Sequence, residues 1–277
     1  MAETLYFSSY GNNKQSSTPL VLLHGWGLNS AVWQPFINSL AENFTDDFQV
    51  ITVDLPGFGL NRDNTIEPYS LANIVTQLNH TISQPAIYLG WSLGGLVATE
   101  MALTHPEKVL ALVSVASSPC FIEKSPCSQE VNSHWPGIKP HILHNFHQQL
   151  KEDTQKTITN FLKIQAMGSP HIRQDIKQIT HLVMQHDMPS KATLDQSLAL
   201  LETSDHRKQL TLIHQPFLRL YGSNDSLVPK RAIEQIAKLA NQSEQHVFSP
   251  ASHAPFISHL DEFNQVVTAW LLEHFSN

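Results

Sequence analysis

The sequence predicts a single α/β fold, in which a mostly parallel central sheet is flanked by helices and a helical lid is inserted before the last two strands. Two observations predict it. Short apolar runs alternate with helical patterns in the first half of the chain, and the alternation resumes near the carboxyl terminus after a purely helical block. Strands that alternate with helices form a parallel sheet covered on both faces. We therefore assign 1–120 and 206–277 to a core domain and 121–205 to a lid (cap) subdomain.

The first half of the core contains four short apolar runs, interspersed with helical patterns. Apolar runs of four to eight residues are typical of buried strands, whereas longer segments with apolar residues three and four apart are typical of helices. We expect strands over 19–23, 48–53, 86–89 and 109–116, and helices over 31–44, 70–81 and 93–104.

The lid contains no run that is typical of a strand. The segment Trp135-Pro136-Gly137-Ile138-Lys139-Pro140 is rich in turn-forming residues and precedes its helices. We expect lid helices over 141–150, 154–167, 171–184 and 193–201, then a strand over 216–221, a helix over 230–239, a strand over 245–248 and a helix over 261–274.

Composition and charge exclude several classes of function. The 277 residues carry a net charge of −7, so the chain as a whole lacks the basic surface that nucleic-acid binding requires. No apolar run approaches the roughly 18 residues of a membrane span, and the first residues lack the apolar centre of a signal peptide. We therefore expect a cytoplasmic protein. A monomer is expected as well, although nothing in the composition determines the oligomeric state. Reduced thiols are expected at Cys120 and Cys127, with a disulfide across their short loop as the open alternative.

The pentapeptide Gly90-Trp91-Ser92-Leu93-Gly94 matches the pattern G-x-S-x-G. An expected strand precedes it and an expected helix follows it. This context is typical of a nucleophile elbow, a tight turn that exposes the serine hydroxyl above the sheet. The alternative is a glycine-rich turn with an incidental serine, and the strand–turn–helix context favours Ser92 as a nucleophile.

A serine hydroxyl becomes a good nucleophile only when a base takes its proton. In this arrangement an acid and then a histidine follow the serine along the chain. Asp225 comes just after the strand expected over 216–221, and His253 lies between the last strand and the last helix, so both are expected at the carboxyl edge of the sheet. The alternatives are a turn-capping aspartate and a surface histidine. His24 and His259 are weaker candidates for the base, because one precedes the nucleophile and the other lies nearer the final helix.

The turn His24-Gly25-Trp26-Gly27 follows the first expected strand. An oxyanion hole of this type uses the backbone N–H of the residue after the nucleophile and a second N–H from such an early loop. We assign these donors to Leu93 and Trp26. Packing is the alternative role for Trp26, and both roles are compatible, because the backbone donates while the indole shapes the pocket.

Several apolar residues near these motifs are candidates to line a channel for an acyl chain of medium length, and ordinary core packing is the alternative for each. They are Trp26, Leu28, Trp91, Leu93, Phe146, Phe161 and Ile164.

Four strings resemble those of the α/β-hydrolase superfamily: HGWG (24–27), DLPGFG (54–59), GWSLGG (90–95) and SHAPF (252–256). WPGIKP (135–140) and SSPCF (117–121) extend the resemblance to the esterase family that cleaves pimeloyl-[acyl-carrier protein] methyl ester in biotin biosynthesis. The resemblance runs from about Val21 to His259, which is most of the chain.

This resemblance implies an α/β-hydrolase fold and a serine carboxylesterase that releases methanol and the free pimeloyl thioester without a metal or other cofactor. Ser92, Asp225 and His253 match the family's catalytic triad, and Trp26 and Leu93 match its oxyanion positions. The resemblance further implies that a lid segment, 161–165, contacts the acyl chain. Substrate contacts are therefore expected at Trp26, Ser92, Leu93, Phe146, Phe161, Leu162, Lys163, Ile164, Gln165 and His253.

Acyl-carrier protein, the partner that the resemblance implies, is acidic. Residues 139–191 contain seven basic and four acidic residues, a net charge of +3, whereas the rest of the chain carries ten basic and twenty acidic residues, a net charge of −10. A locally positive surface is what steering of an acidic partner requires. Lys156, Arg173 and Lys177 match basic positions of the family's lid and are expected to dock the carrier. A solvated face of mixed charge is the alternative.

Two departures from the family pattern affect these expectations. The stretch between Phe121 and Trp135 is longer and carries Cys127, and Asn160 stands where a basic residue is expected. The alternatives that stay open are a broad-specificity carboxylesterase for short-chain acyl esters, a carbon–carbon hydrolase and a non-catalytic binding protein on the same fold. Ser92 argues against a haloalkane dehalogenase or an epoxide hydrolase, which need an aspartate at the elbow.

Overall fold

The computed structural model describes residues 4–11, 17–41, 44–125, 134–167, 169 and 171–275. Within them, seven strands form one sheet in the order β1-β3-β2-β4-β5-β6-β7, and only the edge strand β1 runs antiparallel to its neighbour. The strands are β1 (Phe7–Tyr10), β2 (Thr18–Leu23), β3 (Phe48–Val53), β4 (Ala86–Trp91), β5 (Val109–Val115), β6 (Phe217–Gly222) and β7 (Glu244–Phe248).

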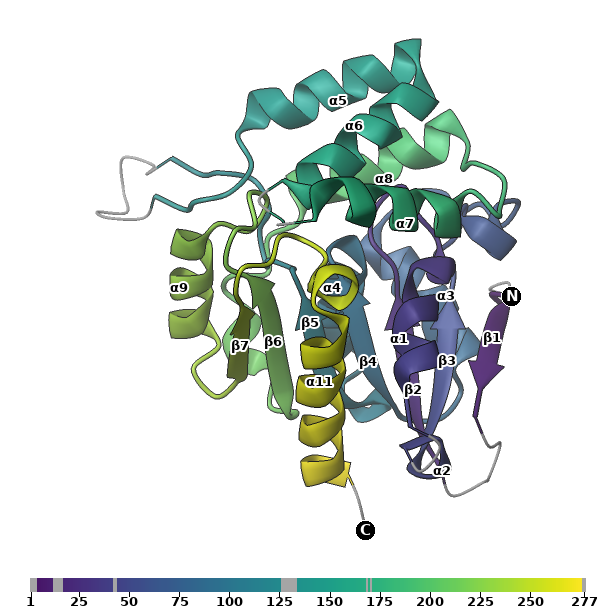
Figure 1. Ribbon diagram of the computed structural model, residues 1–277, viewed down its shortest axis with the longest axis vertical. Helices are drawn as coiled ribbons and strands as arrows, with labels where there is room; N and C mark the ends of the chain where they lie inside the picture. Colours follow the sequence, from purple (N-terminus) through teal and green to yellow (C-terminus); the bar gives the residue numbers. More distant parts are fainter. Residues whose placement is uncertain are drawn as a thin grey trace.

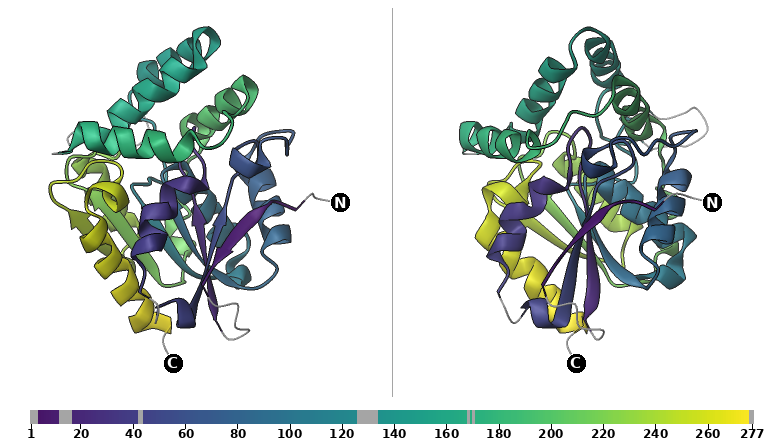
Figure 2. Two further views of the ribbon diagram at one scale, coloured as in Figure 1. Left: turned by 45° about the vertical axis from the view of Figure 1, so that its right-hand side comes forward. Right: turned by 90° about the vertical axis from the view of Figure 1, so that its right-hand side faces the viewer.

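Helices cover both faces of the sheet, so its central strands are buried. Every residue of β4 and β6 is buried, as expected for parallel strands covered on both faces. In Figure 2, α1 (Gln34–Ser39) and α11 (Leu260–Phe275) lie on one face, and α3 (Leu71–Thr81) and α4 (Leu93–Thr104) lie on the other. The remaining core helices are α2 (Phe44–Asp47), α9 (Lys230–Leu239) and α10 (Pro255–Ser258), with 3-10 turns η1 (Ser30–Trp33), η2 (Gly59–Asn61), η3 (Pro106–Lys108) and η4 (Leu210–Leu212).

A helical lid covers the carboxyl edge of the sheet (Figure 1). It is inserted between β5 and β6 and consists of α5 (Pro140–Glu152), α6 (Thr154–Ala166), α7 (Ile172–Val183) and α8 (Lys191–Thr203). Two isolated β-bridges, Ile122 with Ile138 and Lys124 with Trp135, pair residues that follow β5 with residues that precede α5. The α/β fold, its mostly parallel sheet and the helical insertion before the last two strands are confirmed.

The helix expected over 31–44 is wrong in extent. The side chain of Asn29 accepts the N–H of Ala31 at 3.1 Å and begins the short turn η1, and α1 follows from Gln34. Leu40 takes an extended conformation, so α1 ends at Ser39. The strand β1 has no counterpart among the expected elements, because its residues FSSY contain no run of Val, Ile or Leu.

Two strands end at positions that differ slightly from those expected. β4 continues to Trp91, because Gly90 and Trp91 keep the ladder with Ser114 and Val115 of β5. The neighbouring strand β5 ends one residue early, since Ala116 has a φ of 46°, which a strand does not allow. Cys127, the partner of Cys120 in the alternative disulfide, lies outside the described residues, as does most of the long stretch before Trp135. Cys120 itself is buried.

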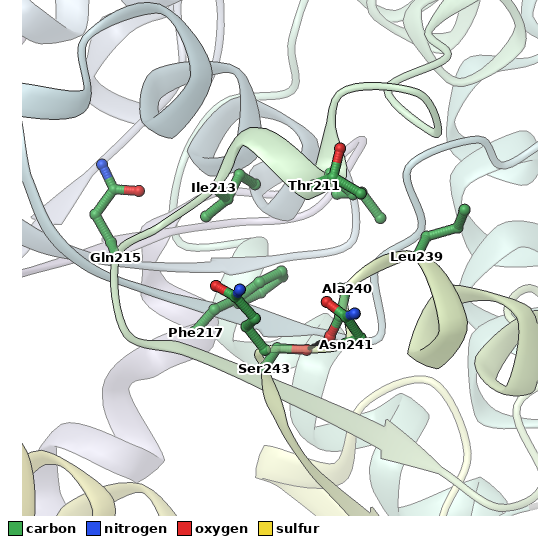
Figure 3. Close-up of a pocket in the computed structure, with 10 residues that line it drawn as sticks. Thr211, Ile213, Gln215, Phe217, Leu239, Ala240, Asn241 and Ser243 are labelled. Atoms are coloured by element: carbon green, nitrogen blue, oxygen red, sulfur yellow. Dashed lines mark hydrogen bonds between the residues drawn. The ribbon is translucent and has the colours of Figure 1, made fainter.

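A small cavity lies at the amino ends of β6 and β7, far from the lid (Figure 3). Its volume is about 10 Å³, which is room for about one water molecule. It therefore does not hold an organic ligand. No helix among the described residues is both long and apolar enough to cross a bilayer.

Candidate active site

Ser92 occupies the sharp turn between β4 and α4. Its φ of 54° and ψ of −114° are unfavourable for a residue with a side chain, and such strain is characteristic of functional turns. The turn depends on close approach of backbone: a Cβ atom on Gly90 would collide with the carbonyl of Gly94, and one on Gly94 would lie 2.5 Å from the carbonyl oxygen of Leu23. The nucleophile elbow expected from the sequence is thus present in its local geometry.

Asp225 and His253 form a buried pair beside this turn. Oδ2 of Asp225 lies 2.8 Å from Nδ1 of His253, and neither side chain is exposed. The other carboxylate oxygen accepts the backbone N–H groups of Leu227 at 2.8 Å and Val228 at 3.1 Å. These bonds fix the carboxylate, which in turn holds the imidazole with its proton on Nδ1.

The backbone of His253 is held from two directions. The indole N–H of Trp91 donates to the carbonyl of His253 at 2.8 Å, and the N–H of His253 donates to the carbonyl of Gln165 at 3.1 Å. Nε2 of His253 is buried and has no hydrogen-bond partner among the described residues. Ser92, which follows Trp91, does not form a hydrogen bond to this nitrogen, and Nε2 remains an unused acceptor within the described chain.

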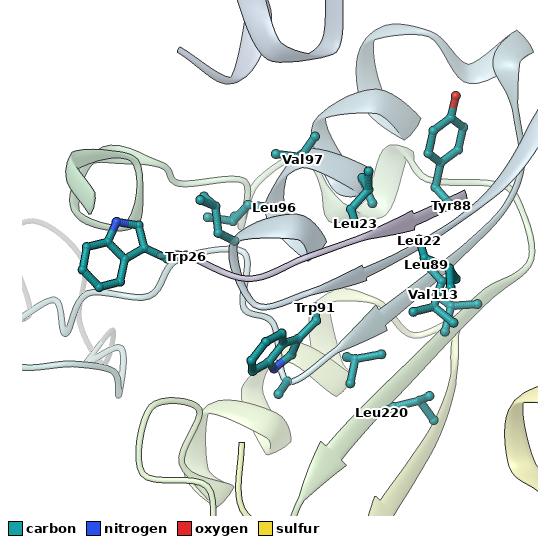
Figure 4. Packing of buried hydrophobic residues seen from close by; sticks show 14 of the residues in the cluster. Leu22, Leu23, Trp26, Tyr88, Leu89, Trp91, Leu96, Val97, Val113 and Leu220 are labelled. Carbon is teal, nitrogen blue, oxygen red and sulfur yellow. The ribbon is translucent and has the colours of Figure 1, made fainter. Parts of the chain in front are cut away.

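Trp26 and Leu93, the residues expected to donate to an oxyanion, belong to neighbouring segments. Leu93 begins α4, so its N–H is one of the first-turn donors that have no acceptor within the helix. Because α4 begins against the carbonyls of Leu23 and His24, this donor lies close to the turn that contains Trp26. Figure 4 shows Trp26 beyond the end of its strand, while Trp91 packs beside the strands.

His24 has a structural position rather than the position of a base. Its ring is completely buried, Nδ1 lies 2.8 Å from the carbonyl oxygen of Gly25, and Nε2 accepts the N–H of Leu55 at 3.0 Å. Burial lowers the pKa of His24 below its ordinary value, although the nearby carboxylate of Asp54 opposes this. The neutral ring therefore links the turn 24–27 to the loop after β3 through these two hydrogen bonds.

Aromatic side chains of the lid pack against Trp26, in the turn 24–27. The ring of Trp26 packs edge-on against Phe161 of α6, with ring centroids 4.8 Å apart. Phe161 packs against Phe146 of α5 in the same way, with centroids 5.4 Å apart. The side-chain amide of Gln165 is also buried, and its oxygen and nitrogen have no partner among the described residues. Of the other lid residues expected to contact substrate, Leu162 is buried, Ile164 is half-buried and Lys163 lies on the exposed side of α6.

The three basic residues expected to dock a partner are all exposed on the lid. Arg173 and Lys177 lie one turn apart on α7, so they share a face. Lys156 lies in the first turn of α6. None of the three forms an ion pair with a described residue.

Two residues that the motifs do not single out connect this site to the lid. The hydroxyl of Ser252 contacts the carbonyls of Gln165 and Met167, and the amide of Asn29 donates to the carbonyl of Val183 at 3.0 Å. A contact between segments more than 80 residues apart leaves no local pattern in the sequence. Together with the buried pair and the elbow, these contacts define a site suited to nucleophilic acyl transfer. Among the described residues, no group of three or more His, Cys, Asp or Glu side chains is arranged to hold a metal.

Comparison with known proteins gives one family and many similar structures. The family model described as the alpha/beta hydrolase fold matches residues 18–260. An esterase from Exiguobacterium antarcticum is 22% identical, with a TM-score of 0.81 over 96% of this chain and 94% of that one. An enol-lactonase from Burkholderia xenovorans LB400 is 16% identical (TM-score 0.78, 96% of each chain), and a thermophilic esterase from Thermogutta terrifontis is 20% identical (TM-score 0.75, 98% and 94%). At these identities the similarity establishes the fold.

The buried His24 predicts a loss of stability in mild acid. The pKa of His24 in the folded chain lies below the ordinary value of 6.5, so the unfolded chain binds this proton more readily. The neutral ring therefore contributes its full stabilising free energy above about pH 6.5, and this contribution is lost as the pH falls. His24→Gln removes the titration. We expect urea unfolding of the variant to show a shallower pH dependence between about pH 5 and pH 7. Identical slopes for the variant and the natural chain would contradict this role.

Proposed function

Because this chain belongs to the α/β-hydrolase fold family, we propose that it is a serine carboxylesterase that acts on the methyl ester of pimeloyl-[acyl-carrier protein]. Ser92 is the nucleophile, His253 is the general base and then the general acid, and Asp225 orients and stabilises the imidazole. The products are methanol and pimeloyl-[acyl-carrier protein]. The substrate assignment rests on the sequence resemblance in WPGIKP and SSPCF and on the lid described below.

The observation that carries this proposal is the state of His253. Its Nδ1 is bound to the fixed carboxylate of Asp225, while Nε2 is buried and has no partner among the described residues. His24, by contrast, uses both ring nitrogens in hydrogen bonds to the backbone. An imidazole oriented by a buried carboxylate, with its second nitrogen free to accept a proton, is the form of histidine that general-base activation of a hydroxyl requires. Trp91, the residue before Ser92, donates its indole N–H to the carbonyl of the same histidine and so brings the two segments together.

The geometry supports a two-step acyl transfer. Nε2 of His253 takes the proton of Ser92 as Oγ attacks the ester carbonyl, and the developing oxyanion accepts the backbone N–H groups of Trp26 and Leu93. The resulting imidazolium, stabilised by Asp225, gives its proton to the methoxy leaving group. Water then attacks the acyl-enzyme by the same route, and the carboxylic acid leaves Ser92. One oxyanion donor of this kind is worth about 3–4 kcal/mol in the transition state.

The lid contributes the surface for the acyl chain. Phe161 and Phe146 extend an aromatic surface from Trp26 into the lid, and an apolar acyl chain gains favourable free energy by covering such rings. The unpartnered amide of Gln165 can donate to or accept from a polar group of the substrate. Lys163, on the exposed side of α6, fits a contact with the carrier better than one with the acyl chain.

Charge on the lid supports an acidic partner. Two of the four acidic residues within 139–191 are engaged within the protein: Asp175 is buried against the hydroxyl of Ser169, and Asp187 pairs with Arg62 at 2.8 Å. Arg173 and Lys177 are exposed and unpaired among the described residues. The solvent-exposed side of α7 therefore carries two basic residues, while the acidic residue of this helix, Asp175, is buried, as electrostatic steering of an acidic carrier requires.

The direct test of substrate compares pimeloyl-[acyl-carrier protein] methyl ester with p-nitrophenyl acetate and butyrate at two salt concentrations. Efficient demethylation of the carrier substrate that weakens with salt supports the proposal. Turnover of the small esters alone would remove the carrier substrate and leave a broad carboxylesterase.

Replacement of Ser92 tests the catalytic role. Ser92→Ala should lower turnover by about 10⁶-fold, because the nucleophile itself is lost, and should leave the far-ultraviolet circular dichroism unchanged. An organophosphonate should label the natural chain once, and should fail to label the variant. Ser223→Ala is the matched control, because the hydrogen bonds of this half-buried hydroxyl among the described residues are to Asn224 and Ser249. A folded natural chain that is not labelled would rule out the enzyme and favour a binding protein.

Charge reversal tests the docking surface. The double variant Arg173→Glu/Lys177→Glu should raise the apparent KM for the carrier-bound ester about tenfold or more, and flatten its salt dependence, because the attraction for the acidic partner is reversed. Turnover of p-nitrophenyl butyrate should not change. Lys238→Glu on α9, an exposed lysine outside the lid, is the control. Equal effects of the double variant on both substrates would contradict docking at α7.

A further inference from the structure

The carboxyl end of lid helix α6 rests on the loop that carries His253. The last carbonyls of a helix have no partner within it and must find one elsewhere. Here the carbonyl of Gln165 accepts the hydroxyl of Ser252 at 2.6 Å and the N–H of His253 at 3.1 Å. The same hydroxyl lies 2.7 Å from the carbonyl oxygen of Met167, so its single hydrogen is shared between two lid carbonyls. The catalytic loop thus caps the lid helix.

The opposite side of the loop is fixed by the core. The indole of Trp91 donates to the carbonyl of His253 at 2.8 Å, so the two peptide groups that flank this residue are bound to different parts of the molecule, one to the lid and one to the core. Ser252 is 2% exposed and His253 is fully buried. In so dry an environment a lost partner is costly, because no water replaces it.

We propose that Ser252 is a positioning residue that couples the docked lid to the placement of the His253 ring. Displacement of α6 removes the acceptors of Ser252 and of the His253 N–H together, so the loop keeps only its core contact. The base is then correctly placed only while α6 is docked. This inference rests on the proposed function, because it takes His253 as the general base.

Two other lid helices, α7 and α8, also accept hydrogen bonds from side chains of the core. The carbonyl of Val183, the last residue of α7, accepts the side-chain amide of Asn29 at 3.0 Å. The carbonyl of Leu194 in α8 accepts the indole N–H of Trp26 at 3.0 Å. Asn29 and Trp26 belong to the loop after β2, which supplies one of the two proposed oxyanion donors. The loop of this donor and the loop of His253 are therefore both bonded to main-chain carbonyls of the lid.

The test is Ser252→Ala, which removes the shared donor and leaves the ring of His253 and its bond to Asp225 available. We expect kcat for p-nitrophenyl butyrate to fall about fivefold to tenfold, with KM changed less than about twofold, as the loss of one buried hydrogen bond would produce. Organophosphonate labelling of Ser92 should slow in parallel. The downfield proton resonance of His253 Nδ1 should broaden, because the ring is less firmly placed.

Two further variants separate positioning from general stability. Ser252→Thr keeps the hydroxyl and should restore most of kcat and the sharp resonance. Ser258→Ala removes a hydroxyl of the same segment, whose hydrogen bonds among the described residues are to the carbonyl of Ala254 at 3.4 Å and to Nδ1 of His259 at 2.9 Å rather than to a carbonyl of the lid. It should leave both readouts at the natural value.

Three outcomes would decide the matter. Parallel losses in kcat, labelling rate and resonance for Ser252→Ala, restored by Ser252→Thr, support the coupling. If the natural chain is labelled and Ser252→Ala lowers only the melting temperature, the proposal is overturned while the esterase assignment stands. If the natural chain is not labelled at all, the esterase assignment fails and this inference fails with it.

Discussion

The hydrogen bond between Nδ1 of His253 and the carboxylate of Asp225 joins loops that follow the neighbouring strands β6 and β7. Both side chains are cut off from water, and a buried carboxylate is stable only when its remaining oxygen is also satisfied. Leu227 and Val228 provide that second pair of bonds from the backbone. The carboxylate cannot move without losing them, so the proton stays on Nδ1 and Nε2 is left as the acceptor.

The order of the strands in the sheet sets how far Ser92 lies from Nε2 of His253. Ser92 follows β4, and β5 separates β4 from β6. The elbow places the serine above the sheet only because Gly90 and Gly94 let β4, β2 and α4 approach one another closely. A sheet whose central strands are buried on both faces is rigid. Residues at the carboxyl ends of its strands are therefore held in fixed positions.

The lid is connected to this rigid edge by hydrogen bonds from side chains as well as by aromatic packing. Helix ends require such partners in any case. For α6 and α7 these partners are Ser252, in the loop that contains His253, and Asn29, in the loop that contains Trp26. The indole N–H of Trp26 also donates to the carbonyl of Leu194, within α8. The exposed side of the lid then remains free to carry basic residues, and the buried side carries Phe161, Phe146 and Gln165 toward the site.

The sequence by itself determined the parallel sheet, the insertion and the residues of the candidate triad. Buried strands require apolar runs, and a strained elbow requires glycines at fixed spacing, so both leave local patterns. It did not determine the edge strand β1, because its four residues lack such a run. Nor did it determine the interruption of the helix expected over 31–44, where the cap at Asn29 begins a short 3-10 turn and the extended Leu40 ends α1. Only the tertiary structure decided that His24 links the turn 24–27 to the loop after β3, that Lys163 faces solvent and that Ser252 bonds to the lid. These roles depend on which partner lies opposite each side chain, and partners more than 80 residues apart are brought together by the fold alone.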